Sequence, residues 1–486
     1  MRTEALILAL ALALAPGLSQ AQGVPSTRGA LPPQVDSAPL GETDPGAVGL
    51  LSPRMTGLPA ALWQRSDGVA LEGLIGAIVP VVPALQDLMH TLMLAEALPP
   101  EGHGMAHLGA RLDWLIDNGA VDEAAALLEI VGHDRPALFA RWADLALLQG
   151  QPESACRTQA AEPRLSGDWS LRVFCIARSG DWTRAALVLQ GARTLGTIPE
   201  RRVDLLERFL DPELAEGAPP LLPPVRPTPL EFRLFEALGE PLPTAPLPLA
   251  FSVLDLTGDN GWRAQIEAAE RLARAGSLPA NRLLGLYTLR EPAASGGVWD
   301  RVAAFQAFEA ALARGRPDAV GPALQRVWPQ MASARLLVPF AELFATGLAA
   351  QRLEGRAARM AQRAAFLSAD YEGLAPAAGA PTDAETAFLA SLARGKAPAS
   401  IPDLPHAEAV AAGFAGAPMP PVLAEQLAAG RLGEVILRAV ALFSSGAEGN
   451  GADLADALAT FRALGLEDVA RRAALQLVLL DAERAL

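Results

Sequence analysis

The sequence predicts an all-α protein built from a series of helical hairpins, an α-solenoid. Three observations lead to this fold class. From Leu108 onward, apolar residues recur at spacings of three and four, which is the period of an amphipathic helix. Turn signals follow about every dozen residues, and the alternating pattern of a β-strand is not found. A Gly-x-x-x-x-Ala unit also recurs at spacings of 31 and 30 residues, which is typical of a repeat architecture.

The composition excludes several classes of protein. With 486 residues, of which 51% are hydrophobic, the chain is long enough for one large or two ordinary domains and too apolar to be disordered throughout. The formal net charge is −14 and no basic stretch occurs, so we expect no nucleic-acid partner. After the amino-terminal segment no run of about 18 apolar residues follows, so no stable membrane span is expected in the mature chain.

The amino terminus has the pattern of a signal peptide over residues 1–21. Arg2 precedes an apolar run over residues 5–15, and Ser19 and Ala21 are small residues at the −3 and −1 sites of a cleavage. An uncleaved membrane anchor is the alternative, but the run is short of the roughly 20 residues that a span needs. We therefore expect cleavage after Ala21 and a periplasmic or secreted protein.

The rest of the chain divides by composition into four segments. Residues 22–60 are rich in Pro, Gly, Ser and Thr and are expected to form a flexible leader. Helical-repeat regions are expected over 61–216 and 251–486. Between them, residues 217–250 carry ten prolines and one short amphipathic helix, which indicates an ordered connector between two halves. The repeat phasing fails over 374–421, so no boundaries are predicted there.

The Gly-x-x-x-x-Ala units are expected to be the turns of the hairpins. A glycine accepts the left-handed conformation that ends the first helix, and a small alanine lets the second helix pack closely against it. Three units follow one another in register, and a further one lies near the carboxyl end. The four pairs are Gly119 and Ala124, Gly150 and Ala155, Gly180 and Ala185, and Gly465 and Ala470.

The turn at 180–185, Gly-Asp-Trp-Thr-Arg-Ala, resembles that of the tetratricopeptide-repeat superfamily, which commonly reads Gly-Asp-aromatic-x-x-Ala. The turn at 119–124 is similar, with Val121 in the aromatic position. The period departs from the family's length of about 34 residues, and the terminal proline is missing. Membership of another superfamily of degenerate helical hairpins is therefore the alternative. The resemblance implies a right-handed superhelix with a concave peptide-binding face, and it implies no catalytic residue.

Cys156 and Cys175 are the two cysteines of the chain, so one pair can form. If their helices run antiparallel around a loop centred between Leu165 and Ser166, the two positions lie at the same height. We therefore expect a disulfide, with a pair of ordinary buried thiols as the alternative. A redox-active pair is not expected because Cys-x-x-Cys is absent.

No arrangement of catalytic residues is recognisable, so we expect a protein that is not an enzyme and that holds no cofactor. His103 and His107 have the spacing of two metal ligands on one helical face, but no third ligand is identifiable. Gly102 and Gly104 also make the first helical turn doubtful there. The two histidines are interpreted as polar residues at a helix start, and no metal site is expected.

Two functions are compatible with this pattern. The first is a non-enzymatic periplasmic scaffold or adaptor that binds a protein or peptide through a superhelical groove, for example in a cell-envelope assembly. The alternative is an accessory or inactive relative of a cell-wall (peptidoglycan) enzyme that binds glycan. With aromatic residues at only 5%, the chain offers few rings on which a sugar could stack, and this favours the first function.

Overall fold

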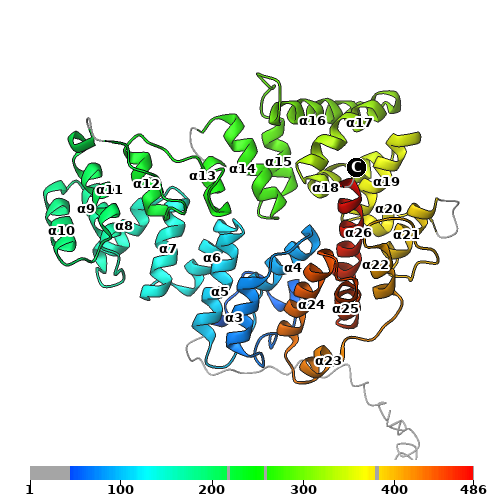
Figure 1. Ribbon diagram of the computed structural model, residues 1–486, viewed down its shortest axis with the longest axis horizontal. Coiled ribbons are helices and arrows are strands. Elements are labelled where there is room, and N and C mark those ends of the chain that lie inside the picture. Colours follow the sequence, from blue (N-terminus) through cyan, green and yellow to red (C-terminus); the bar gives the residue numbers. More distant parts are fainter. Residues whose placement is uncertain (1–43, 216–218, 257–259, 378–382, 485–486) are drawn as a thin grey trace, which may run out of the picture. The chain divides into compact units, whose positions relative to one another are not determined.

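Helices make up all the regular secondary structure of the described residues, so the prediction of an all-α protein is confirmed (Figure 1). The computed structural model describes residues 44–215, 219–256, 260–377 and 383–484. An isolated β-bridge joins Leu51 to Ala95. The predicted signal peptide and the leader up to residue 43 lie outside the described residues. Within the described part of the chain, no helix is long and apolar enough to cross a membrane.

Four elements precede helix α5 (Gly104–Asp117) in the described chain. They are η2 (Pro45–Ala47), α2 (Pro53–Thr56), α3 (Gly68–Ala77) and α4 (Pro83–Leu94). Three of them, η2, α3 and α4, pack against α5. The prediction of a flexible leader up to residue 60 is wrong for residues 44–60. The buried Arg111 of α5 donates a hydrogen bond of 3.1 Å to the carbonyl of Gly46, and the side chain of Asp44 caps η2. The prolines and glycines of this stretch form caps and turns of the fold.

From α5 to α11, each helix packs against the next one along the chain. These helices are α5, α6 (Val121–Val131), α7 (Pro136–Leu148), α8 (Pro152–Ala161), α9 (Trp169–Arg178), α10 (Trp182–Thr194) and α11 (Glu200–Leu210). The apolar periodicity predicts helices over 108–116, 137–148 and 170–178. The structure has α5, α7 and α9 at these places, so the helical pattern located them well.

The described part of the proline-rich segment is ordered, as expected for a connector. Its elements are η3 (Pro212–Ala215) just before it, α12 (Pro229–Ala237), and η4 (Leu249–Phe251) at its end. Thr228 and Glu231 form a capping box that starts α12. The Nε of Arg233 donates a hydrogen bond of 2.9 Å to the carbonyl of Leu147, which attaches α12 to the end of α7.

Seven further helices follow the connector. They are α13 (Ser252–Leu256), α14 (Trp262–Arg274), α15 (Ala280–Tyr287), α16 (Val298–Ala313), α17 (Pro317–Ser333), α18 (Leu337–Ala349) and α19 (Gly355–Leu367). The sequence predicts that α17 ends at Trp328, before Pro329, but the helix continues to Ser333. Burial of Trp328 and Met331 stabilises the extra turn against the hydrogen bond that the proline removes.

Seven helices complete the described chain, and the second and third of them lie within residues 374–421, where the repeat phasing fails. They are α20 (Tyr371–Leu374), α21 (Ala384–Ala393), α22 (Ala407–Phe414), α23 (Pro421–Ala428), α24 (Leu432–Ala447), α25 (Gly451–Ala463) and α26 (Glu467–Arg484). Helix α26 contacts α17, α19, α21 and α25, so it lies at the centre of this part of the fold.

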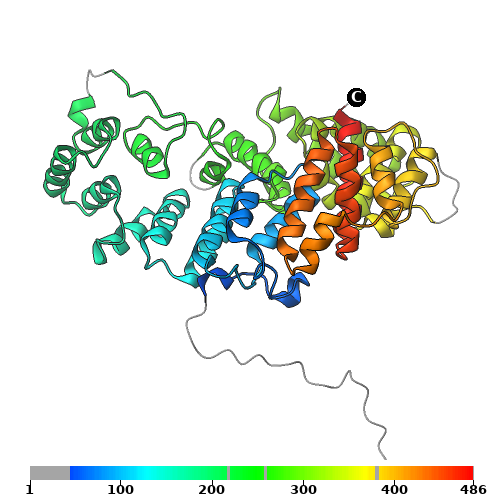
Figure 2. The same cartoon turned by 60° about the horizontal axis from the view of Figure 1, so that its bottom comes forward.

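Helices from the beginning and the end of the described chain lie side by side, as Figures 1 and 2 show. Helix α4 (blue) packs on α26 (red), and α3 (blue) packs on α24 (orange). The backbone N–H of Ala84 donates a hydrogen bond of 2.7 Å to Oε1 of the buried Gln476. The carbonyl of Leu62 accepts one of 3.0 Å from the N–H of Gly433. Residues from Asp44 onward form one compact unit, and its contacts do not separate at the proline-rich segment.

Candidate functional site

The four predicted turn glycines each end a helix in the left-handed conformation. Their φ angles are 78° at Gly119, 75° at Gly150, 90° at Gly180 and 77° at Gly465. The N–H of each glycine donates to the carbonyl three residues earlier, and the N–H of the following residue donates to the carbonyl five residues before it. This is the Schellman motif. The alanines five positions after the glycines are fully buried, and they are Ala124, Ala155, Ala185 and Ala470.

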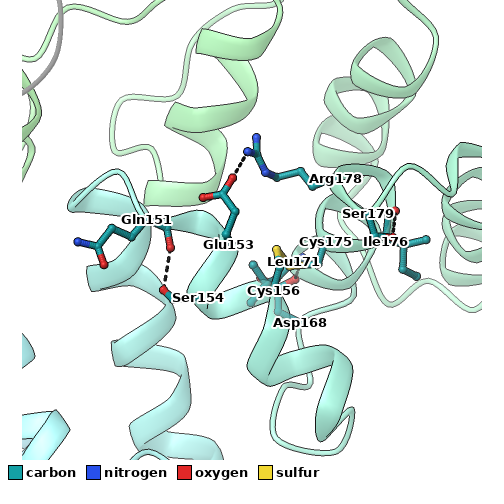
Figure 3. The surroundings of a disulfide bond; sticks show 10 residues. All are labelled: Gln151, Glu153, Ser154, Cys156, Asp168, Leu171, Cys175, Ile176, Arg178 and Ser179. Atoms are coloured by element: carbon teal, nitrogen blue, oxygen red, sulfur yellow. Dashed lines mark hydrogen bonds and ion pairs between the residues drawn. A yellow bond between two sulfur atoms is a disulfide. The ribbon is translucent and has the colours of Figure 1, made fainter.

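Two of these turns bring the cysteines together. The turn at Gly150 starts α8 and the turn at Gly180 ends α9, and the two helices pack against each other. The Sγ atoms of Cys156 and Cys175 lie 2.07 Å apart and their Cα atoms 5.0 Å apart (Figure 3). The predicted pair is therefore at bonding distance, and it links α8 to α9.

A pocket of about 570 Å³ lies beside the disulfide. Its walls come from α8, from α9 and from the beginning of α10. Pro163 and Ile176 add apolar surface next to the two cysteines. Four arginines also line the pocket, and they are Arg157, Arg172, Arg178 and Arg184. Because the whole chain carries a net charge of −14, this group of cations is a local exception.

Two of the four arginines are engaged by the protein itself. Arg178 of α9 forms an ion pair with Glu153 of α8, alongside the disulfide (Figure 3). The pKa of Glu153 lies below its usual range, first because a backbone N–H hydrogen-bonds the carboxylate and then because Arg178 is close. The guanidinium of Arg172 stacks on the ring of Trp169, 4.5 Å from its centroid.

The other two arginines have no close partner, although the charge of Arg157 also helps to lower the pKa of Glu153. The guanidinium groups of Arg157 and Arg184 make no ion pair or hydrogen bond with any residue that the structure describes. Glu153, the carboxylate that lines the pocket, is already paired with Arg178. The pocket therefore has an excess of positive charge that its own residues do not neutralise.

Gln159 is the most unusual residue of the pocket. Its side chain is 3% exposed, and neither Oε1 nor Nε2 has a hydrogen-bond partner among the described residues. A buried polar group without a partner costs about 1–3 kcal/mol. A primary amide offers one acceptor and two donors, which complement the N–H and C=O of a peptide group. An occupant of the pocket that paired with Gln159 would remove this cost.

The two histidines with metal-ligand spacing, His103 and His107, have different surroundings in the structure. His103 precedes the first residue of α5, as expected for a polar residue at a helix start, and its Nδ1 lies 3.3 Å from Oε1 of Glu72. His107 is fully buried, and its ring centroid lies 5.3 Å from that of Trp63. The interpretation as a helix-start residue is therefore wrong for His107, which belongs to the core.

The sequence pattern identified the turns and the cysteines of this region but not its polar lining. Arg157, Gln159 and Arg184 lie at ordinary helical positions with no motif around them, and each resembles a solvated surface residue. Their grouping depends on how α8, α9 and α10 pack, which a local pattern does not contain. No model of a protein family, no curated protein and no solved structure matches the chain.

Proposed function

We propose that the protein is a non-enzymatic scaffold or adaptor that binds an acidic segment of another protein at the pocket beside the disulfide. The observation that carries this proposal is the buried Gln159, whose amide group has no partner among the described residues. In the proposal, α5 to α11 form a solenoid of tetratricopeptide-like hairpins, and the pocket belongs to its groove. The succession of packed helices and the repeated Schellman turns support that arrangement.

The chemistry of the pocket selects the partner class. The amide of Gln159 would pair with a backbone peptide group, while Arg157 and Arg184 would bind carboxylates of the same segment. Pro163, Ile176 and the disulfide offer apolar contact for the stems of the bound side chains. A short acidic stretch in extended conformation satisfies all three requirements.

The proposed location is outside the cytoplasm, in the periplasm or as a secreted protein. The signal-peptide pattern of residues 1–21 supports export. The cysteine pair is also typical of oxidising compartments, because disulfides are rare where thiols are kept reduced.

The test compares variants that keep the fold. Gln159→Leu removes both unpaired polar atoms at nearly constant volume, so we expect its stability to equal or exceed that of the unmodified protein. Capture of protein partners from envelope extract, quantified by mass spectrometry, should fall in Gln159→Leu and in Arg157→Glu. Arg164→Glu is the matched control, because Arg164 is exposed and does not line the pocket.

Sedimentation with purified peptidoglycan separates the proposal from the glycan-binding alternative. We expect no sedimentation of the unmodified protein under conditions in which it captures a protein partner. The proposal would be rejected if Gln159→Leu and Arg157→Glu captured the same proteins as Arg164→Glu. It would also be rejected if the protein sedimented with peptidoglycan and captured no protein.

A further inference from the structure

A second cavity, of about 620 Å³, lies where helices from four separate parts of the sequence meet. Its lining comes from the linker between α3 and α4, from the end of α14, from α17 to α19, and from the end of α26. Helices α17, α19 and α26 contact one another around it. The volume falls within the range of small-molecule sites, which is about 300–1,000 Å³.

Four arginines line this cavity, and most of their charge is not neutralised within it. Arg335 and Arg356 make no side-chain hydrogen bond or ion pair with a residue that the structure describes. The guanidinium of Arg274 donates one hydrogen bond, of 3.4 Å, to a backbone carbonyl. Arg484 is paired with Asp481 at 2.7 Å. Three of the four cations therefore lack a carboxylate partner.

The nearby carboxylates are committed to other arginines. Glu483, which lines the cavity, forms an ion pair with Arg363. Glu270 is bound by Arg301 at 2.7 Å. The pKa of Arg274 is lowered, first by burial and also by the positive charges of Arg301 and Arg335, although Glu270 opposes the shift. Among the cations of the cavity, Arg335 thus acts on Arg274, and Glu270 counteracts its effect.

The backbone at Arg335 is an independent observation that points to a ligand. The turn between α17 and α18 is a Schellman motif like those at the turn glycines, since Arg335 N–H donates to Ala332 and Leu336 N–H donates to Met331. The φ angle of Arg335 is 57°, a conformation in which a side chain is strained and glycine is not. Such strain is found mainly where a side chain serves a function. Here the side chain of Arg335 lines the cavity and is exposed to solvent.

From the unneutralised arginines and the strained turn we propose that this cavity binds a small organic phosphate, a phosphate monoester on an apolar body. A phosphate monoester carries about −1.5 to −2 charges and three acceptor oxygens, which match several guanidinium groups. Trp328, Leu337, Val338 and Leu480 give the cavity an apolar side for the organic part. The indole N–H of Trp328 also has no partner among the described residues. The site shares no residue with the pocket beside the disulfide and does not depend on the function proposed there.

Titration calorimetry with phenyl phosphate tests the site directly. The full chain should bind phenyl phosphate, and it should bind benzoate, a monoanion of similar size, at least about tenfold more weakly because one charge-assisted interaction is lost. Affinity should fall with added salt. Vesicles of phosphatidylcholine with phosphatidic acid form a second arm, which distinguishes a lipid headgroup from a soluble phosphate.

Two variants and one control identify the residues. Arg335→Gly should weaken phenyl phosphate binding at least about tenfold, yet its Tm should equal or exceed that of the unmodified protein because glycine relieves the turn. Arg356→Gln should weaken binding similarly. Arg359→Gln is the matched control, since Arg359 is an exposed residue of the same helix α19 that does not line the cavity, and it should leave binding unchanged.

The outcomes are distinct. Loss of binding in Arg335→Gly with an unchanged or raised Tm supports the site, because a purely structural arginine would not have this effect. If the unmodified protein instead binds phosphatidic acid vesicles and not phenyl phosphate, and both variants lose that binding, the site is supported and its phosphate belongs to a lipid headgroup. The proposal is overturned if the unmodified protein binds neither probe at millimolar concentration, if benzoate binds as tightly as phenyl phosphate, or if both variants bind like Arg359→Gln.

Discussion

At the scale of single residues, His107 makes the stability of the protein depend on pH. Its ring is fully buried, and neither ring nitrogen has a hydrogen-bond partner among the described residues. Burial lowers the pKa of His107 to about 3, and the nearby Arg111 adds to the effect. In the unfolded chain a histidine titrates near pH 6.5. Between these two values the unfolded chain binds a proton that the folded protein does not, so the free energy of unfolding falls as the pH is lowered through this window.

We therefore predict that acidification from pH 7 to pH 5 lowers the free energy of unfolding by about 2 kcal/mol through His107 alone. His107→Leu, which fills the same apolar site without a titratable group, should lose this part of the pH dependence. Urea denaturation of both proteins at the two pH values measures the difference. Equal pH dependence in the two proteins would contradict the prediction.

The residue scale is also where the sequence was least informative. His107 reads as a polar residue near a helix start because its partner Trp63 lies far away along the chain. The burial of Gln159 is equally hard to predict from the sequence, since a glutamine at a helical position is normally expected to be exposed. Burial of a polar side chain follows from tertiary packing, and a single sequence does not display it.

At the scale of secondary-structure elements, the disulfide fastens α8 to α9. The cysteines are 19 residues apart in the sequence, so the bond restricts a short loop of the unfolded chain. We predict that the double variant Cys156→Ala, Cys175→Ala has a free energy of unfolding lower by about 3 kcal/mol in the chain-entropy treatment. Urea denaturation measures it, and the unmodified protein with a reductant should unfold at the same midpoint as the double variant. If the reductant left the midpoint of the unmodified protein unchanged, the stabilising role of the bond would be refuted.

Helices and turns were largely predictable because their signals are local. The glycines at 119, 150, 180 and 465 were found from a recurring small residue five positions later, and all four have the expected positive φ. The same turn at Gly430 lacks this sequence signal because Val435, not alanine, is the buried residue five positions after it. The turn at Arg335 could not be predicted, since no propensity favours arginine in the left-handed conformation.

At the scale of the whole described unit, contacts between its earliest and latest helices hold it together. The buried Gln476 of α26 accepts a hydrogen bond from the backbone of Ala84, and Arg472 pairs with Asp87 at 3.0 Å. We predict that Gln476→Leu costs about 1–3 kcal/mol of stability, because the N–H of Ala84 is left buried and unpaired. Hydrogen exchange should show reduced protection in α4 as well as in α26, while α9 and α10 keep theirs. Unchanged protection in α4 would contradict the coupling.

The expectation of two halves depends on composition alone. A proline-rich stretch interrupts the helical pattern of the sequence, but it does not indicate which helices meet in space. The hydrogen bond from Ala84 to Gln476 joins residues 392 positions apart in the sequence, and a local sequence pattern does not predict such a contact.

The same contact sets an order of events during biosynthesis. A chain made from its amino terminus presents α3 and α4 long before their packing partners α24 and α26 exist. Helix α5 can cover part of these early helices, but the surfaces that α24 and α26 cover stay exposed until nearly all of the polypeptide has emerged. Contacts of such wide sequence separation slow folding, because a long loop must close before they form. Transiently exposed apolar surface of this kind favours aggregation, and a ribosome that stalls before α24 leaves a nascent chain whose first helices cannot complete their native contacts.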